Sequence, residues 1–148
     1  MSSQTIRLNN GKFAIVTTDL SRIFVRENRY TEGTYNNPGY VDSVLPIGTV
    51  MGRVAATQKV KPCDSASTDG SQFPIGVLAD DFTVTPGSNV VVPICIFGEV
   101  IAAKLSFFNG TDTLDSIVSS RSYRDRVASD SAGIRLIVSD ELTDYDNY

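Results

Sequence analysis

The feature that most constrains this chain is the presence of glycine and proline inside its apolar segments. Residues 45–54 read LPIGTVMGRV, and residues 73–78 read FPIGVL. Glycine and proline restrict a strand to an edge, a bulge or a tight bend. The pattern therefore predicts a small, sharply folded β-domain without a binding pocket for a cofactor. It favours a structural or binding role over catalysis.

Further runs of strand-forming residues recur along the chain. In the longest, residues 90–97 (VVVPICIF), Pro93 argues against a central position in a sheet, and Gly98–Glu99 is expected to break the run. In all, the sequence predicts about six to eight short strands. The remaining predicted strands are residues 12–17, 22–26, 59–62, 100–105 and 134–138.

One short helix is predicted from the segment that begins at Asp112. Thr113 can cap a helix, and acidic residues in the first turn are favourable beside the helix dipole. Leu114, Ile117 and Val118 follow at the spacing i, i+3 and i+4, which gives an apolar face. With the strands, this predicts a mainly β fold, a β-rich α+β domain with one short helix.

Polar residues dominate segment 27–40, in which tyrosine recurs every five residues at Tyr30, Tyr35 and Tyr40. That spacing matches neither a helix face nor a strand face. We expect an ordered loop or extended arm that lies on another surface through its tyrosines, which interfaces favour. The alternative is a loop packed on its own domain.

The length of 148 residues fits a single domain. We divide it into an N-terminal arm or extension with short strands (residues 1–44), a β-domain (45–138) and an acidic tail (139–148). The sequence has no apolar run of about 18 residues, so no membrane-spanning helix is expected. Its first residues lack the pattern of a secretory signal, so we expect synthesis in a cytoplasm.

Charge is distributed unevenly along the chain. The net charge is −4, but the first thirty residues carry a net +3 and the last ten a net −4. A basic start and an acidic tail suit contact with a larger charged surface. The alternative is that both ends are solvated. With an overall pI near 4.7 and no basic stripe with interleaved aromatics, nucleic acid is not an expected partner.

Residues for catalysis are scarce in the sequence. Histidine is absent, which excludes histidine-dependent nucleophile systems and the commonest metal ligand. Asp80 and Asp81 are adjacent aspartates, and we interpret them as turn residues rather than cation ligands. Cys63 and Cys95 are expected to be free thiols in a cytosolic setting. The sequence therefore predicts no catalytic, cofactor-binding or metal-binding residues.

The order of these features resembles the head decoration (capsid cement) proteins of tailed bacteriophages, the lambda gpD-like family. The resemblance covers roughly residues 45–138. It rests on the opening 45–50, the strand with Lys59 and Lys61, the polar loop ending at Asp69–Gly70, the strands 76–78 and 90–97, the step 98–100, the helix near Leu114, and the closing segment 132–138.

That resemblance implies a small β-barrel or β-tulip-like domain that forms a homotrimer. Such trimers bind the major capsid protein on the outer surface of the expanded head, at three-fold and quasi-three-fold sites, and stabilise it against internal DNA pressure. The location would be the virion, after synthesis in the host bacterial cytoplasm, with no nucleic-acid or membrane partner. The first 44 residues are longer than in the small prototype, which leaves open whether their strands belong to the core and which segment docks.

Two sets of contact residues follow from this resemblance and from the charge and tyrosine patterns. The predicted trimer contacts are Val91, Ile94, Ile96 and Phe97. The predicted capsid contacts are Ile6, Arg7, Leu8, Arg22, Arg26, Tyr30, Tyr35 and Tyr40.

Two other classes of function remain open on the sequence. The first is a trimeric fibre- or tail-associated receptor-binding protein of a phage, which would use exposed tyrosines to bind cells or glycans. The second is a small trimeric β-enzyme of nucleotide metabolism, similar to a dUTPase. For that enzyme the only trace is the sequence PGYVD at residues 38–42.

Overall fold

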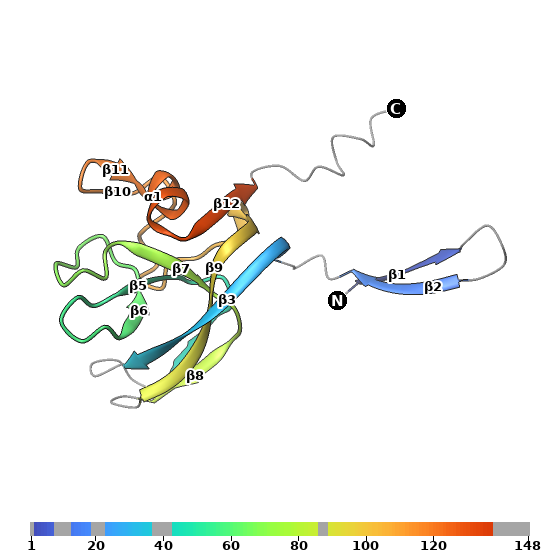
Figure 1. The fold of residues 1–148 in the computed structure, drawn as a ribbon, viewed down its shortest axis with the longest axis horizontal. Coiled ribbons are helices and arrows are strands. Elements are labelled where there is room, and N and C mark those ends of the chain that lie inside the picture. The colour runs from blue at the N-terminus through green and yellow to red at the C-terminus, as the bar shows by residue number, and fades with distance from the viewer. Residues whose placement is uncertain (1, 8–12, 19–22, 37–42, 86–88, 138–148) are drawn as a thin grey trace.

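Most of the described chain is β-strand. The structure, a computed structural model, describes residues 2–7, 13–18, 23–36, 43–85 and 89–137 (Figure 1). A short 3-10 helix covers Ala102–Lys104. The other elements are β1 (Ser2–Arg7), β2 (Phe13–Thr18), β3 (Phe24–Asn36), β4 (Ser43–Leu45), β5 (Val50–Arg53), β6 (Val60–Pro62), β7 (Pro74–Leu78), β8 (Phe82–Val84), β9 (Asn89–Ile101), β10 (Ile117–Val118), β11 (Arg121–Ser122), α1 (Tyr123–Asp130) and β12 (Gly133–Ile137).

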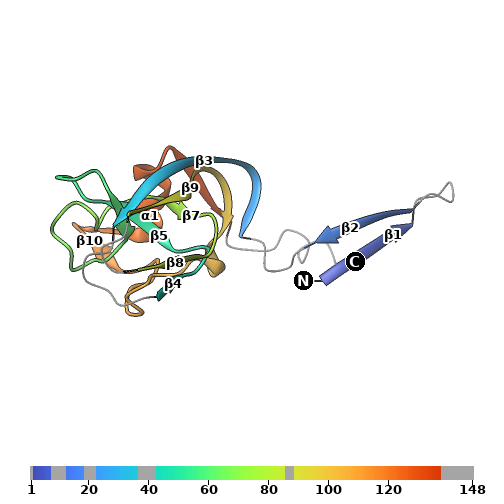
Figure 2. The same ribbon diagram turned by 90° about the horizontal axis from the view of Figure 1, so that it is seen from below.

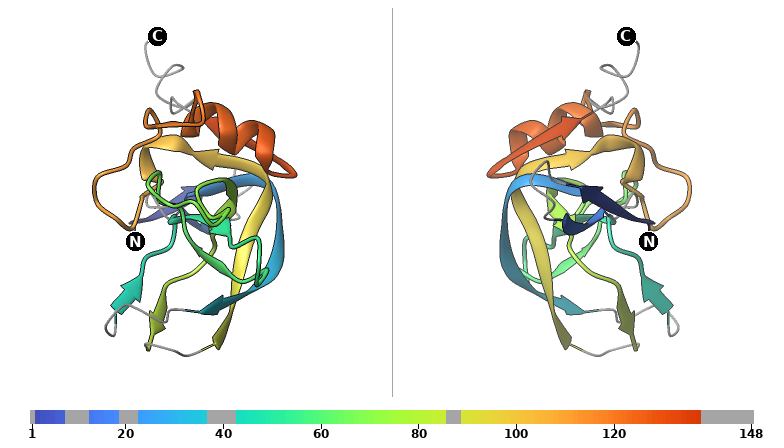
Figure 3. Two further views of the ribbon diagram at one scale, coloured as in Figure 1. Left: turned by 90° about the vertical axis from the view of Figure 1, so that its left-hand side faces the viewer. Right: turned by 90° about the vertical axis from the view of Figure 1, so that its right-hand side faces the viewer.

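The main sheet closes on itself around β9. Its strand order is β12-β9-β3-β6-β5-β7, and β7 also pairs with β9. The strands β9, β3, β6, β5 and β7 therefore form a closed ring, while β12 continues the sheet beyond β9 (Figure 3). The β12–β9 and β3–β6 pairs are parallel, and the other pairs of this sheet are antiparallel. The predicted mainly β fold with one short helix is confirmed for the described part of the chain.

Strand β9 differs from its prediction in two respects. It continues through Gly98 without a break, because Gly98 adopts φ 112° beside a shift in the β3–β9 register. Pro93 is also central in the sheet rather than at an edge. Its carbonyl accepts a hydrogen bond from the Ala79 amide, just beyond the end of β7. The N–H and C=O groups of a strand residue face the same side of the strand. Pro93 has no N–H, and on that side β7 has already ended, so proline is tolerated at this position.

Alternation along the strands divides the buried side chains between two cores. Among the described residues, Val50 and Val77 belong to one apolar cluster, and their neighbours Met51 and Leu78 belong to the other. The first cluster lies under α1 and includes Val127, and the second fills the lower part of the ring. Successive strand residues point to opposite faces, so β5 and β7 each supply both cores.

The predicted helix is wrong in position. The segment after Asp112 forms turns and the short β10–β11 hairpin, and α1 begins only at Tyr123. Ser122 caps that helix, because its side chain accepts a hydrogen bond from the Asp125 amide. The apolar pair that suggested a helix face alternates as in a strand: Val118 is buried, whereas Ile117 is 64% exposed.

The N-terminal region contains both a separate hairpin and part of the ring. β1 and β2 pair only with each other, in a two-stranded sheet drawn apart from the main sheet (Figure 2). β3, in contrast, pairs with β9 along its length. β3 therefore belongs to the main sheet by its pairing, and the segment expected to be a loop or arm over 27–40 is a strand as far as Asn36. The acidic tail 139–148 lies outside the described residues.

Glycine is required in β5 because another backbone crosses it closely. A Cβ atom on Gly52 would overlap the carbonyl oxygen of Ser71. The β5–β7 register also shifts between Met51 and Gly52. A side chain here could be accommodated only by moving backbone, since no flexible side-chain end is available to give way.

We therefore expect Gly52→Ala to destabilise the fold by about 3 kcal/mol through overpacking. Gly110→Ala is the matched control, because Gly110 has φ 72° but open space around its Cα. Gly110→Ala should lower the free energy of unfolding by only about 1 kcal/mol, the cost of a left-handed backbone conformation for alanine. Urea unfolding monitored by circular dichroism measures both, and equal losses would contradict the proposed clash.

Candidate interaction surfaces

The outer face of the β3–β9 ribbon carries exposed apolar side chains. Thr34 lies opposite Val91, and Glu32 lies opposite Pro93. Val91 is 57% exposed, and Tyr30, on the same face of β3, is 53% exposed. Val91 and Tyr30 thus leave apolar area exposed at two places along this face.

Aromatic contacts fix the upper part of this ribbon. The ring of Tyr30 packs edge-on against Phe24, with 5.8 Å between ring centroids. The guanidinium of Arg29 lies 5.0 Å from the ring centroid of Phe97. Because these contacts restrict the rotamers, less entropy is lost when the same side chains are covered by a partner.

A row of charged side chains crosses three neighbouring strands. Arg26 on β3, Glu99 on β9 and Arg135 on β12 occupy matching positions in the sheet. One oxygen of Glu99 accepts hydrogen bonds from both guanidinium groups, at 3.1 Å from Arg26 and 3.2 Å from Arg135. The Glu99 side chain is only 12% exposed, but the two arginines are 66% and 76% exposed. The row therefore presents net positive charge to solvent.

Two predicted contact residues prove to be core residues. Tyr35 and Ile94 are fully buried in the cluster inside the ring. Their side chains belong to the protein's own interior and offer no surface to a capsid or to another subunit. The spacing of five explains Tyr35, since it places Tyr30 and Tyr35 on opposite faces of one strand.

The other predicted contact residues fall into three groups. Arg26, Tyr30 and Val91 are exposed, while Ile96 and Phe97 are partly buried. Ile6 and Arg7 lie in β1, and only their backbone is described. Leu8, Arg22 and Tyr40 lie outside the described residues.

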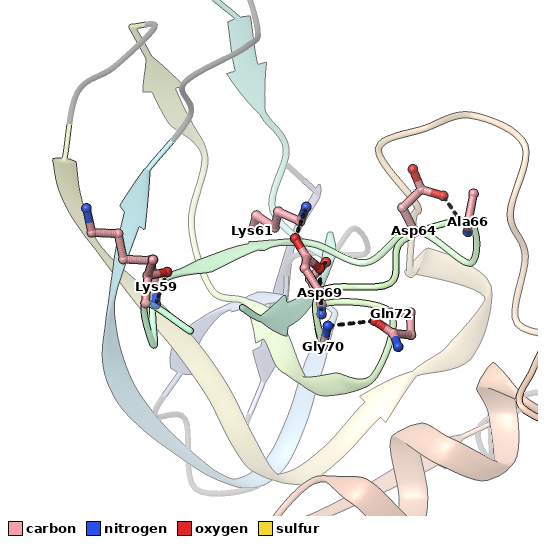
Figure 4. A network of polar contacts seen from close by, with 9 residues as sticks. Lys59, Lys61, Asp64, Ala66, Asp69, Gly70 and Gln72 are labelled. Atoms are coloured by element: carbon pink, nitrogen blue, oxygen red, sulfur yellow. Dashed lines mark hydrogen bonds and ion pairs between the residues drawn. The ribbon is translucent and has the colours of Figure 1, made fainter. Parts of the chain in front are cut away.

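The polar loop between β6 and β7 is ordered by its own side chains (Figure 4). The ammonium group of Lys61 lies 2.7 Å from the Asp69 carboxylate, which also accepts hydrogen bonds from the amide and hydroxyl of Ser71. These hydrogen bonds, first from Lys61 and then from Ser71, lower the pKa of Asp69 to about 2.

A second network joins this loop to the segment after the 3-10 helix, and sequence reasoning did not find it. The Asp112 carboxylate accepts hydrogen bonds from the amide and hydroxyl of Ser65 and from the side-chain amide of Asn109. Partial burial opposes ionisation of Asp112, but these hydrogen bonds outweigh it and lower its pKa overall. Residues 47 positions apart in sequence are thereby held together. No local pattern could reveal such a contact.

The two cysteines are free, as predicted, and both are buried. Burial raises the pKa of the Cys63 thiol strongly, and the nearby carboxylates of Asp112 and Asp64 add to the effect. Burial also raises the pKa of Cys95. Since the thiolate is the reactive form, both side chains behave as small apolar groups.

The Asp80–Asp81 pair takes part in a turn. The Asp81 carboxylate accepts a hydrogen bond of 2.6 Å from the Ile47 amide, and that of Asp80 accepts one from the Asp81 amide. In the described segments, no three His, Cys, Asp or Glu side chains gather as metal ligands. None of the described helices has the length and hydropathy needed to cross a bilayer.

The described part of the chain thus presents an exposed sheet face, fixed aromatic side chains and a row of charges. The comparisons name the family. The model of the bacteriophage lambda head decoration protein D family matches residues 36–119, more than half of the chain, so this chain belongs to that family of phage head decoration proteins. A comparison with curated proteins gives no significant match. The resemblance seen in the sequence is thus confirmed.

The ion pair in the polar loop predicts a loss of stability in acid. The folded pKa of Asp69 is lowered, so its contribution is present above the unfolded pKa of about 4 and is lost as the pH falls toward 2. The contribution is about 1 kcal/mol or less, because solvent screens a partly exposed pair. Asp69→Asn should flatten the acid limb of unfolding free energy between pH 5 and 2. An acid limb as steep in Asp69→Asn as in the wild type would contradict the assignment.

Proposed function

We propose that this chain is a capsid cement protein without enzymatic activity. It forms a homotrimer that binds the major capsid protein on the outer surface of the expanded head, at three-fold and quasi-three-fold sites. There it stabilises the shell against internal DNA pressure. The family match supports the role in the head, and the exposed face of β3 and β9 supports assembly through sheet surfaces.

In this proposal the trimer buries the part of the β3–β9 face around Val91. Burying an exposed valine is worth about 1.5 kcal/mol, and three copies around one axis bury it three times. Pro93 and Thr34 flank Val91 and contribute contact area. Cyclic closure then limits growth, because each subunit uses the same two complementary surfaces.

Docking on the capsid uses the N-terminal region. The β1–β2 hairpin precedes the ring and does not pair with it, so its edges can add to strands of the capsid subunits. The basic residues near it, such as Arg26, would meet an acidic shell surface. Each contact is weak, but a trimer presents three at once and gains from effective concentration. Binding that favours the expanded shell stabilises that state by mass action.

Val91→Glu tests the trimer interface. Burial of an unpaired carboxylate should cost at least about 2 kcal/mol per subunit, a roughly thirtyfold weaker association. Light scattering coupled to size exclusion measures the shift from trimer toward monomer. Ile117→Glu is the matched control, because Ile117 is similarly exposed but lies on β10. A wild-type monomer, or an equal effect of both variants, would contradict the interface.

Removal of residues 1–22 tests the docking element. The cut leaves the hydrogen bond from the Ile101 amide to the Ile23 carbonyl and keeps all of β3. A longer deletion to residue 42 would remove β3 and disrupt the ring. We expect a folded trimer that no longer co-sediments with expanded heads. Wild-type binding should also weaken as salt is added. Full occupancy by the truncated protein would rule out the N-terminal region as the docking element.

A further inference from the structure

A groove with a basic lining runs between α1 and β12. Its walls include Arg121 and Arg124 on one side and residues 133–136 of β12 on the other. Four consecutive residues of β12 line it, and its described lining contains no residue of β9, the strand on the opposite side of β12. The groove therefore follows the outer edge of β12. Every lining residue lies beyond position 119, outside the segment that matches the family model.

The strand beside this groove has an open edge. β12 ends the strand order of the main sheet, so in the described part of the chain its outer edge has no neighbouring strand. Figure 1 shows β12 at the border of the sheet, with α1 packed against it. An open edge of a parallel strand can accept a further strand, and natural proteins usually cover or blunt such edges.

The lining of the groove attracts acidic groups. It contains three arginines and one acid, Asp125. Arg124 pairs with Asp115 at 3.3 Å, and Arg135 shares Glu99 with Arg26, so part of their charge is balanced. Arg121 is exposed and has no ion-pair partner in the described regions. An extended acidic segment would satisfy both the charge and the open edge.

The chain itself contains a segment of that kind, directly after β12. Residues 139–148 read SDELTDYDNY and carry four acidic side chains without a basic one. A reversal of two to four residues would leave six or more to run back along the five residues of β12. Its Ser and Asp residues at the start suit such a turn. Because the segment is tethered to the strand that borders the groove, its effective concentration there is high.

We propose that residues 139–148 fold back on their own chain, pair with the outer edge of β12 and place their carboxylates against Arg121, Arg124 and Arg135. The segment covers the edge that would otherwise recruit strands from other chains. This inference concerns the isolated protein and does not depend on the proposed capsid role.

Hydrogen exchange of the full-length protein tests the proposal. The β12 amides that do not bond to β9 should exchange on the order of tenfold more slowly in the wild type than in a variant with a neutral tail. That variant carries Asp140→Asn, Glu141→Gln, Asp144→Asn and Asp146→Asn. The protection should also fall when salt is raised.

A second pair of variants tests the groove side. Arg121→Glu should make the outer β12 amides exchange as fast as they do in the neutral-tail variant. Arg53→Glu makes the same charge change on β5, outside the groove, and should leave their exchange unchanged. Unprotected outer amides in the wild type, or equal exchange in the wild type and the neutral-tail variant, would overturn the proposal.

Mixing the chains distinguishes docking within one chain from docking between chains. Isotope-labelled neutral-tail protein is mixed with unlabelled wild type, and exchange is followed in the labelled chain. If the labelled β12 remains unprotected, the wild-type segment acts on its own chain, as proposed. Protection transferred to the labelled chain would overturn intramolecular docking.

Discussion

The structure depends on one long strand that pairs on both sides. β9 bonds to β3 over its length, and its other edge bonds first to β7 and then to β12. The β7 contact closes the ring, and the β12 contact extends the sheet under α1. Proline at position 93 and glycine at position 98 make this division possible. The first lies where β7 has ended, and the second permits a register shift opposite β3.

Because β9 pairs with β7 along one part and with β12 along another, its two parts expose different faces of the sheet. Near Gly98 and Val100, one face of the sheet lies under α1, while the opposite face presents the row of Arg26, Glu99 and Arg135. Near Val91, the inner face fills the ring and the outer face is open. The fold therefore presents two distinct surfaces, the charged row and the open face around Val91.

The sequence predicted three of the short strands closely, because strand alternation and turn residues are local signals. Strands β6, β7 and β12 lie within a residue of their predicted bounds. It failed where distant contacts decide. The segment from Tyr30 to Tyr35 is a strand because it pairs with β9. The segment from Leu114 to Val118 was predicted to be helical but leads into a hairpin, in which Ser119 and Ser120 have positive φ. Burial of Tyr35 and Ile94 depends on ring closure, which no spacing along the chain reveals.

The β3–β9 ribbon has a mechanical consequence. A pull on the chain just before Phe24 acts along the axis of β3, parallel to its partner rather than across it. The inter-strand hydrogen bonds from Tyr30 to Asn36 are then loaded together in shear and must fail together, whereas a perpendicular force would open them one at a time. Tension between the N-terminal segment and the Asn89 end of β9 would therefore load these hydrogen bonds in shear, whereas tension against the Ile101 end of β9 would open them in turn.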